Sequence, residues 1–137
     1  MIFISSPASA ASLQGGTETI LVAEDDSSLQ KLTAMVLSNY GYVVIEAVDG
    51  QSAVEKLVEN SDRINLVILD AIMPKKNGRE AYQEMRLVRP ELKAVFLSGY
   101  SRDLCAVGNV LEENSIFIQK PFLPDELLVT VRKMLDK

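Results

Sequence analysis

Short apolar runs alternate with longer segments of helical periodicity from about residue 19 to the end of the chain. The short runs are rich in β-branched residues and are typical of strands buried on both faces, whereas apolar residues at every third or fourth position are typical of helices. The predicted strands cover residues 20–23, 42–46, 66–69, 94–97 and 116–118. This alternation predicts an α/β fold, a (βα)5 three-layer sandwich around a five-stranded parallel sheet.

The first helix is expected to follow the capping candidate Ser27 and to end before Gly41. Its apolar residues recur at helical spacing and are expected to face the sheet. These residues are Leu29, Leu32, Met35 and Val36.

Four further helices are predicted from the same signals. The second can be capped by Asp49 or Ser52, the third covers residues 77–88, the fourth covers residues 102–111, and the last opens at Pro124. The residues expected to face the sheet are Ala53, Val54, Leu57 and Val58 in the second helix, Ala81, Met85 and Val88 in the third, and Leu127, Leu128, Val131, Met134 and Leu135 in the last.

Composition limits the class of protein. Residues 1–18 are mostly small and polar and are interpreted as a flexible lead-in or linker, which leaves residues 19–137 as one domain. The chain is 47% hydrophobic, but no apolar run approaches the ~18 residues that a membrane span needs, so a soluble protein is expected. The net charge of −5 opposes binding to nucleic acid.

Two residue counts narrow the chemistry further. The single cysteine, Cys105, excludes an internal disulfide and fits a reducing compartment, so a cytoplasmic location is expected. Histidine is absent, which excludes a Ser-His-Asp triad, a histidine-ligated zinc site and a histidine phosphocarrier.

Polar residues collect where the predicted strands end. The first strand runs into Glu24 and Asp25, the third into Asp70, the fourth into Ser98 and the fifth into Lys120. Parallel strands bring these ends to one edge of the sheet, where ligands bind in such folds. Two charges about 4 Å apart repel by roughly 4 kcal/mol at an effective dielectric near 20, and one lysine cannot neutralise three acids.

A divalent cation with oxygen ligands can offset this repulsion, and Mg²⁺ fits a small set of carboxylates better than a closed calcium site does. With a metal bound, the free oxygen of Asp70 could attack phosphorus, Lys120 could hold the phosphoryl oxygens, and Ser98 could donate a hydrogen bond to them. The alternative interpretation is that these acids are solvated strand ends.

Other phosphate chemistries lack their local signals. The chain has no P-loop and no GxGxxG after the first strand, and acids stand where a flavin site needs a phosphate-binding loop. A phosphatase with an aspartate nucleophile would need a second acid two residues after Asp70, and this chain has Ile72 there.

The ordered set of these motifs resembles the receiver domain of bacterial two-component response regulators over residues 19–137. The matching motifs are Glu24-Asp25-Asp26, Asp70-Ala71-Ile72-Met73-Pro74 with Asn77-Gly78, Ser98-Gly99, and Lys120-Pro121-Phe122. The resemblance implies the flavodoxin-like strand order 2-1-3-4-5 and a phosphoacceptor that catalyses only its own phosphorylation and dephosphorylation.

The resemblance also assigns roles to residues. It implies that Asp70 accepts the phosphoryl group, that Asp25 and Asp70 bind Mg²⁺ with the backbone carbonyl of Ile72, and that Glu24 contributes through water. It implies a cis bond before Pro121.

The resemblance further implies that Ser98 and Lys120 bind the phosphoryl group. Ala71, Gly99 and Tyr100 are expected beside it.

Receivers report phosphorylation through a hydroxyl and an aromatic residue, which here match Ser98 and Phe117. The expected switch surface comprises the predicted helix 102–111, the fifth strand and the last helix. The alternative for Phe117 is a permanently buried aromatic.

The implied partner is a histidine kinase or a histidine phosphotransfer protein, and the switch surface could also bind a downstream protein or a second copy. The segment from Gly15 to Val22 and the turn from Ser98 to Ser101 are most similar to receivers at the C-terminal end of hybrid sensor histidine kinases. The sequence leaves open whether this receiver stands alone. It also leaves open a degenerate receiver that only binds other proteins, and a magnesium-dependent phosphatase.

Overall fold

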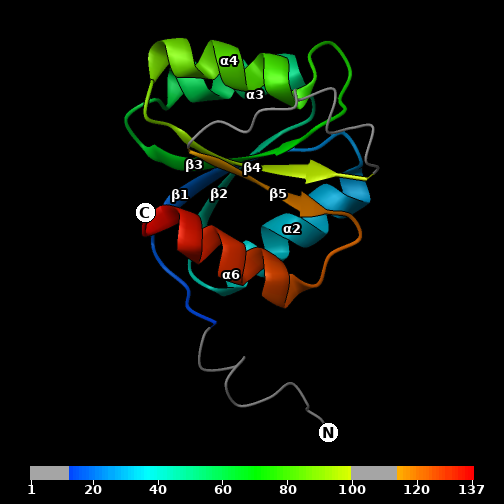
Figure 1. Ribbon diagram of the computed structural model, residues 1–137, viewed down its shortest axis with the longest axis vertical. Coiled ribbons are helices and arrows are strands. Elements are labelled where there is room, and N and C mark those ends of the chain that lie inside the picture. The colour runs from blue at the N-terminus through cyan, green and yellow to red at the C-terminus, as the bar shows by residue number, and fades with distance from the viewer. Residues whose placement is uncertain (1–12, 100–113) are drawn as a thin grey trace, which may run out of the picture.

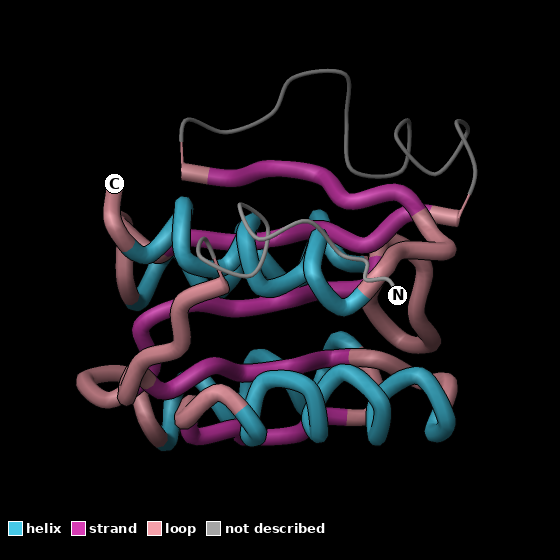
Figure 2. The backbone as a smooth tube through the Cα atoms, turned by 90° about the horizontal axis from the view of Figure 1, so that it is seen from below, coloured by secondary structure: helices cyan, strands magenta, loops and turns pink. Residues whose placement is uncertain are grey.

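The computed structural model of the chain describes residues 13–99 and 114–137, and its centre is a five-stranded parallel sheet in the order β2-β1-β3-β4-β5. The described strands are β1 Thr19–Ala23, β2 Val43–Ala47, β3 Ile64–Asp70, β4 Lys93–Ser98 and β5 Ser115–Gln119. Figure 1 and Figure 2 show the strands side by side in this sheet. The predicted α/β fold and strand order are confirmed, and each predicted strand is present.

Helices cover both faces of the sheet. One layer contains α3 (Gly50–Glu59) and α4 (Gly78–Val88), and the other contains α2 (Ser27–Asn39) and α6 (Pro124–Leu135) (Figure 1). Alternate strand residues enter two separate cores, because successive side chains of a strand point to opposite faces. In β3, for example, Val67 and Leu69 pack toward α3 and α4, while Leu66 and Ile68 pack toward α2 and α6.

The first helix differs from the prediction in its cap and in two of its four apolar residues, whereas Val36 packs against the core as predicted. The side chain of Asp26, not Ser27, caps α2, and it accepts hydrogen bonds from two backbone N–H groups. Leu32 and Met35 are 46% and 53% exposed. The residues of α2 that are buried are Gln30, Thr33, Ala34 and Leu37. The helix lies against the sheet on this face because Thr33 and Ala34 are small and Gln30 hydrogen-bonds to strand carbonyls.

The other helices agree better with the sequence pattern. Ala53 and Leu57 of α3 and Ala81 and Met85 of α4 are buried as predicted, but Val58 and Val88 near the helix ends are exposed. In α4 the buried aromatic Tyr82 was missed, and its hydroxyl donates to the carbonyl of Leu92.

In α6 the predicted residues Leu127, Leu128, Val131 and Met134 are buried, and Leu135 is partly buried. The predicted helix 102–111, with Cys105, lies outside the described residues.

The segment before β1 makes contacts with α6 and with the turn after α2. The side chain of Arg132 donates to the carbonyl of Gly15 at 3.2 Å and to the Glu18 carboxylate at 2.8 Å, and the N–H of Gly16 donates to the Tyr40 carbonyl. Gly41 ends the turn at φ 98°, a left-handed conformation that glycine adopts without strain. The assignment of residues 1–18 to a lead-in stays a prediction.

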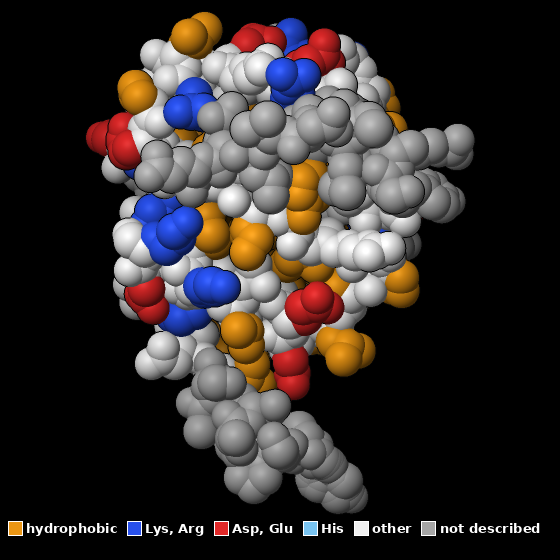
Figure 3. All heavy atoms as spheres, viewed as in Figure 1, with side chains coloured by type: hydrophobic (Ala, Val, Ile, Leu, Met, Phe, Trp, Pro, Cys, Tyr) orange, Lys and Arg blue, Asp and Glu red, His pale blue; other side chains and the backbone are white. Residues whose placement is uncertain are grey.

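The surface seen in Figure 3 carries acidic, basic and apolar side chains intermixed. Among the residues that the structure describes, no helix has the length and apolar character needed to cross a bilayer.

Candidate functional site

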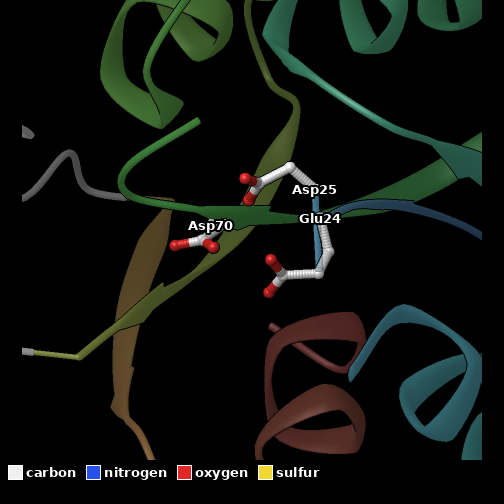
Figure 4. Close-up of side chains that lie close together, drawn as sticks. All are labelled: Glu24, Asp25 and Asp70. Atoms are coloured by element: carbon white, nitrogen blue, oxygen red, sulfur yellow. The ribbon is translucent and has the colours of Figure 1, made fainter. Parts of the chain in front are cut away.

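Three carboxylates meet at the carboxyl edge of the sheet. Glu24 and Asp25 follow β1 and Asp70 is the last residue of β3; each offers an oxygen within 4.8 Å of the others (Figure 4). Glu24 is 1% exposed and Asp70 6% exposed, whereas Asp25 is open to solvent. The cluster predicted from the strand ends is therefore present.

Strand pairing explains why these acids meet. In the parallel pair of β1 and β3, Ala23 is the register partner of Leu69, so the next residue of each strand, Glu24 or Asp70, leaves the sheet at the same level. The Glu24 carboxylate accepts a hydrogen bond from the N–H of Asp26 at 3.0 Å. Asp26 in turn caps α2, so the acidic turn is fixed to both the strand and the helix.

Lys120 follows β5 directly and supplies positive charge to the cluster across the end of β4. Its Nζ lies 2.9 Å from an Asp70 oxygen and 3.2 Å from a Glu24 oxygen. The bond from Lys120 to Pro121 is cis, as predicted. The N–H of Lys120 donates to the carbonyl of Ser98 at 2.7 Å, which ties the turn after β5 to the end of β4.

One lysine does not balance the negative charge of this cluster, and the pKa shifts of Glu24 and Lys120 follow from this excess. Burial, together with the hydrogen bond and charge of Asp70, raises the pKa of Glu24 to about 7 although Lys120 is adjacent. Burial alone would lower the pKa of Lys120, but the hydrogen bonds and charges of Asp70 and Glu24 raise it above its usual value. The site holds more negative charge than its lysine offsets.

The residues present fit a hard divalent cation. Glu24, Asp25 and Asp70 offer only oxygen ligands, and their mutual repulsion disfavours the metal-free arrangement. An open set of a few carboxylates matches the preference of Mg²⁺, which keeps several water ligands. The chemistry of the donor set thus agrees with the predicted cofactor.

The loop after β3 surrounds the Asp70 side chain. The N–H of Ile72 lies 3.3 Å from an Asp70 oxygen, Ala71 is buried, and Ile72 is 49% exposed. A side chain at position 78 would begin 2.6 Å from the Asp70 carbonyl oxygen, so Gly78 is required by close backbone approach. The sequence motif contains Gly78, but its physical reason emerges only from the structure.

The remaining predicted residues lie on β4 and β5. Ser98 is buried at the end of β4, and Gly99 lines the same pocket as Asp70 and Lys120. Phe117 is partly buried, with its ring centroid 5.6 Å from that of Phe96. This packing is compatible with both interpretations of Phe117. Tyr100 lies outside the described residues.

An apolar pocket of about 1210 Å³ opens beside the acidic cluster. Leu29 and Leu32 of α2 line it on one side, and Pro121 and Phe122 of the turn after β5 line it as well. Sequence periodicity missed this pocket because it assigned both leucines to the sheet-facing side of α2.

The family model described as the response regulator receiver domain matches residues 20–132. The chain belongs to this family. As a receiver domain, it is a component of two-component signalling, and receivers typically serve as signalling phosphoacceptors rather than as enzymes. The predicted family and its signalling context are confirmed.

Individual relatives agree with this assignment. The receiver is 33% identical over 122 residues to the sensor kinase CckA of Brucella abortus, covering 89% of this chain and 13% of the kinase. It is 30% identical to the transcriptional regulatory protein CssR of Bacillus subtilis, covering 85% of this chain and 51% of CssR. The chain therefore spans only part of these relatives.

A solved receiver domain from the hybrid histidine kinase CckA superposes with a TM-score of 0.75 at 31% identity. The match covers 85% of this chain and 98% of that one. The receiver studied here is thus similar, in sequence and in fold, to a receiver of a hybrid kinase.

Proposed function

We propose that Asp70 accepts a phosphoryl group from a histidine of a partner protein, in a magnesium-dependent phosphorelay. The partner is a histidine kinase or a histidine phosphotransfer protein. The observation that carries this proposal is the position of Asp70, 2.9 Å from Lys120 and within 4.8 Å of oxygens of Glu24 and Asp25.

In the proposed transfer, a carboxylate oxygen of Asp70 forms a bond to phosphorus. The bond from phosphorus to the donor imidazole nitrogen breaks, its electron pair leaves with that nitrogen, and an acyl phosphate results. Positioning and charge stabilisation supply most of the catalysis in such reactions. Lys120 would hold a phosphoryl oxygen and Ser98 would donate a hydrogen bond to another.

Mg²⁺ would be held by Asp25, Asp70 and the backbone carbonyl of Ile72, with Glu24 acting through water, and it would supply positive charge near the phosphoryl oxygens. The excess negative charge of the cluster and the raised pKa of Glu24 support this assignment.

The pocket beside the acids supports docking of the phosphodonor protein. Leu32 is 46% exposed and Leu123 is 71% exposed, and Leu29 and Phe122 line the pocket next to Asp70. An apolar surface adjoining the reactive carboxylate would let a partner place its histidine while burying these side chains.

The output is part of the proposal as well. Phosphorylation would draw Ser98 inward and move Phe117, which would alter the surface formed by β5, α6 and the predicted helix 102–111. A downstream protein or a second copy would bind there. We place the domain in the cytoplasm, in agreement with its single cysteine.

Intact-mass measurement tests the proposal. The protein is incubated with Mg²⁺ and a small-molecule phosphodonor, beside Asp70→Asn and the matched surface control Asp62→Asn. A single phosphoryl adduct is expected on the wild type and on Asp62→Asn, and none on Asp70→Asn. No adduct on the wild type would favour a receiver that only binds other proteins, and an equal adduct on Asp70→Asn would mean that another residue accepts the phosphoryl group.

A further inference from the structure

A buried glutamine connects the first described helix to the strands below the acidic cluster. Gln30 is only 5% exposed, although it lies on the sheet-facing side of α2, where an apolar residue is the usual occupant. Its amide Nε2 donates to the carbonyl of Ala47 at 2.6 Å and lies 3.5 Å from the carbonyl of Val22. Burial of a side-chain amide is tolerated when the amide forms hydrogen bonds, as it does here.

The contacts with the Val22 and Ala47 carbonyls place the Gln30 amide next to the strand ends from which the acidic turn begins. Val22 and Ala47 lie at the carboxyl ends of β1 and β2, and Ala47 is the register partner of Ala23. The Ala47 carbonyl also accepts the N–H of Glu24 at 3.1 Å. One carbonyl oxygen therefore binds both the Gln30 amide and the backbone of the first acid in the cluster.

The acidic turn is fixed a second time at its far end. The Glu24 carboxylate accepts the N–H of Asp26, and the Asp26 carboxylate accepts the N–H groups of Ser28 and Leu29 in the first turn of α2. The next residue of the same helix, Gln30, donates to the Ala47 carbonyl. Together with the chain, these hydrogen bonds form a closed ring. It runs from Glu24 through Asp26 and the first turn of α2 to Gln30, and returns to Glu24 through the Ala47 carbonyl.

We infer that Gln30 is a positioning residue for the Mg²⁺ site, an inference that rests on the proposed function. Gln30 fixes the spacing between α2 and the ends of β1 and β2. That spacing in turn fixes where the carboxylates of Glu24 and Asp25 lie relative to Asp70. Metal affinity depends on such outer partners because they limit how far the ligands relax when no metal is bound.

The test is a measurement of Mg²⁺ affinity by calorimetric titration of the unphosphorylated protein. Gln30→Met keeps a similar side-chain volume and removes the amide donor. Direct outer partners of metal ligands are worth about 10- to 100-fold in affinity, and Gln30 acts one step further away, so we expect a loss of about 3- to 10-fold.

Two substitutions on the same helix face separate positioning from packing. The hydroxyl of Thr33 is buried and without a hydrogen-bond partner among the described residues, so Thr33→Val replaces a buried hydroxyl by a methyl group and leaves the ring intact. Leu37 is fully buried, so Leu37→Ala destabilises α2 by loss of packing. Both variants are expected to bind Mg²⁺ within about twofold of the wild type, since neither side chain bonds to the turn.

The outcomes are distinct. Wild-type Mg²⁺ affinity in folded Gln30→Met overturns the inference, as does an equal loss of affinity in Leu37→Ala. If Gln30→Met does not fold, Gln30→Asn, whose amide is one methylene too short to reach Ala47, serves in its place under the same criteria. Failure of the wild type itself to bind Mg²⁺ would instead contradict the proposed function.

Discussion

Two ionic clusters lie at opposite ends of β1 and contain one base and two acids each. After the strand, Lys120 contacts Glu24 and Asp70; before it, Arg132 contacts Glu18 and Asp136. The pKa of Glu24 is raised to about 7 by burial and by Asp70, whereas the hydrogen bond from Arg132 holds the pKa of Glu18 below its usual value.

The difference lies in solvation and donor geometry. Glu24 is almost fully buried and Asp25 adds a third negative charge, while the side chain of Asp136 is 60% exposed. The guanidinium of Arg132 carries its donors on three separate nitrogens, and it bonds two carboxylates and the Gly15 carbonyl at the same time. One base between two acids therefore stabilises the fold at one end of β1, whereas burial and the third acid leave a site prepared for a cation at the other.

The largest expected effect is on the rate of phosphorylation, which should depend on Lys120 and not on Arg132. Lys120→Gln should slow phosphorylation by a small-molecule donor about 100-fold, because it removes a charged donor from the phosphoryl oxygens. Arg132→Gln, the matched change at the other cluster, should leave that rate within about twofold, since Arg132 acts on the fold and not on the reacting atoms.

The measurement is the rate of appearance of the phosphoryl adduct at saturating Mg²⁺. Equal rates for the two variants would mean that the clusters do not differ in function as proposed. Thermal unfolding of Arg132→Gln provides the complementary readout, with a loss of about 1–2 kcal/mol expected for a partly exposed network.

The next effect is on stability: neutralising Glu24 and neutralising Glu18 should change the free energy of unfolding in opposite directions. In the metal-free protein at pH 8, Glu24→Gln should raise the free energy of unfolding by about 1–2 kcal/mol, because it removes a buried charge beside Asp70. Glu18→Gln should lower the free energy of unfolding by about 1 kcal/mol, because it breaks the contact with Arg132.

The pH dependence of the Glu18 contact follows from its lowered pKa. The contact stabilises the fold above the ordinary pKa of 4.5, where Glu18 is ionised in both states. As the pH falls further, Glu18 becomes protonated, so the difference in unfolding free energy between wild type and Glu18→Gln should shrink toward zero. Urea denaturation from pH 7 to pH 3 measures this difference, and a constant difference would contradict the assigned role of Glu18.

The smallest effect concerns the backbone near each cluster. Near the Arg132 cluster, the residue with a left-handed backbone is Gly41, which adopts that conformation without strain. In the loop after Asp70, the left-handed residue is Lys75, at φ 70°, whose side chain makes this conformation strained. Lys75→Gly should therefore stabilise the protein by about 0.5 kcal/mol, after allowance for the extra chain entropy of glycine. The exposed contact from Lys75 to Asp49, 3.6 Å long, contributes little. Thermal unfolding of Lys75→Gly, with Lys75→Ala as control, distinguishes strain relief from loss of the lysine.

Strand ends were predictable from the sequence and helix faces were less so. Leu66 to Leu69 form a short, partly β-branched apolar run that favours a buried strand, and an acid is expected to emerge at the end of such a strand, so Asp70 was placed correctly. Lys120 followed from the same logic on β5. In α2, apolar periodicity pointed to Leu32 and Met35, yet small residues and the Gln30 amide determine the buried side.

The pocket and the glutamine ring depend on contacts between residues far apart in the chain. Gln30 and Ala47 are 17 positions apart, and the periodicity of one helix carries no information about a carbonyl on another strand. Leu29 and Leu32 were identified as apolar, but their place beside Phe122 required the helix rotation that the pattern misjudged.

Gly78 offers a way to move the phosphoacceptor without altering any charge. Its Cα faces the backbone of Asp70 so closely that a methyl group would start 2.6 Å from the carbonyl oxygen. Substitution by alanine, then serine, then valine would displace the end of β3 by growing amounts, while Lys120, Glu24 and Asp25 kept their chemistry. Such a series would measure the positional tolerance of the reactive oxygen, the distance by which it can shift before the reaction is lost.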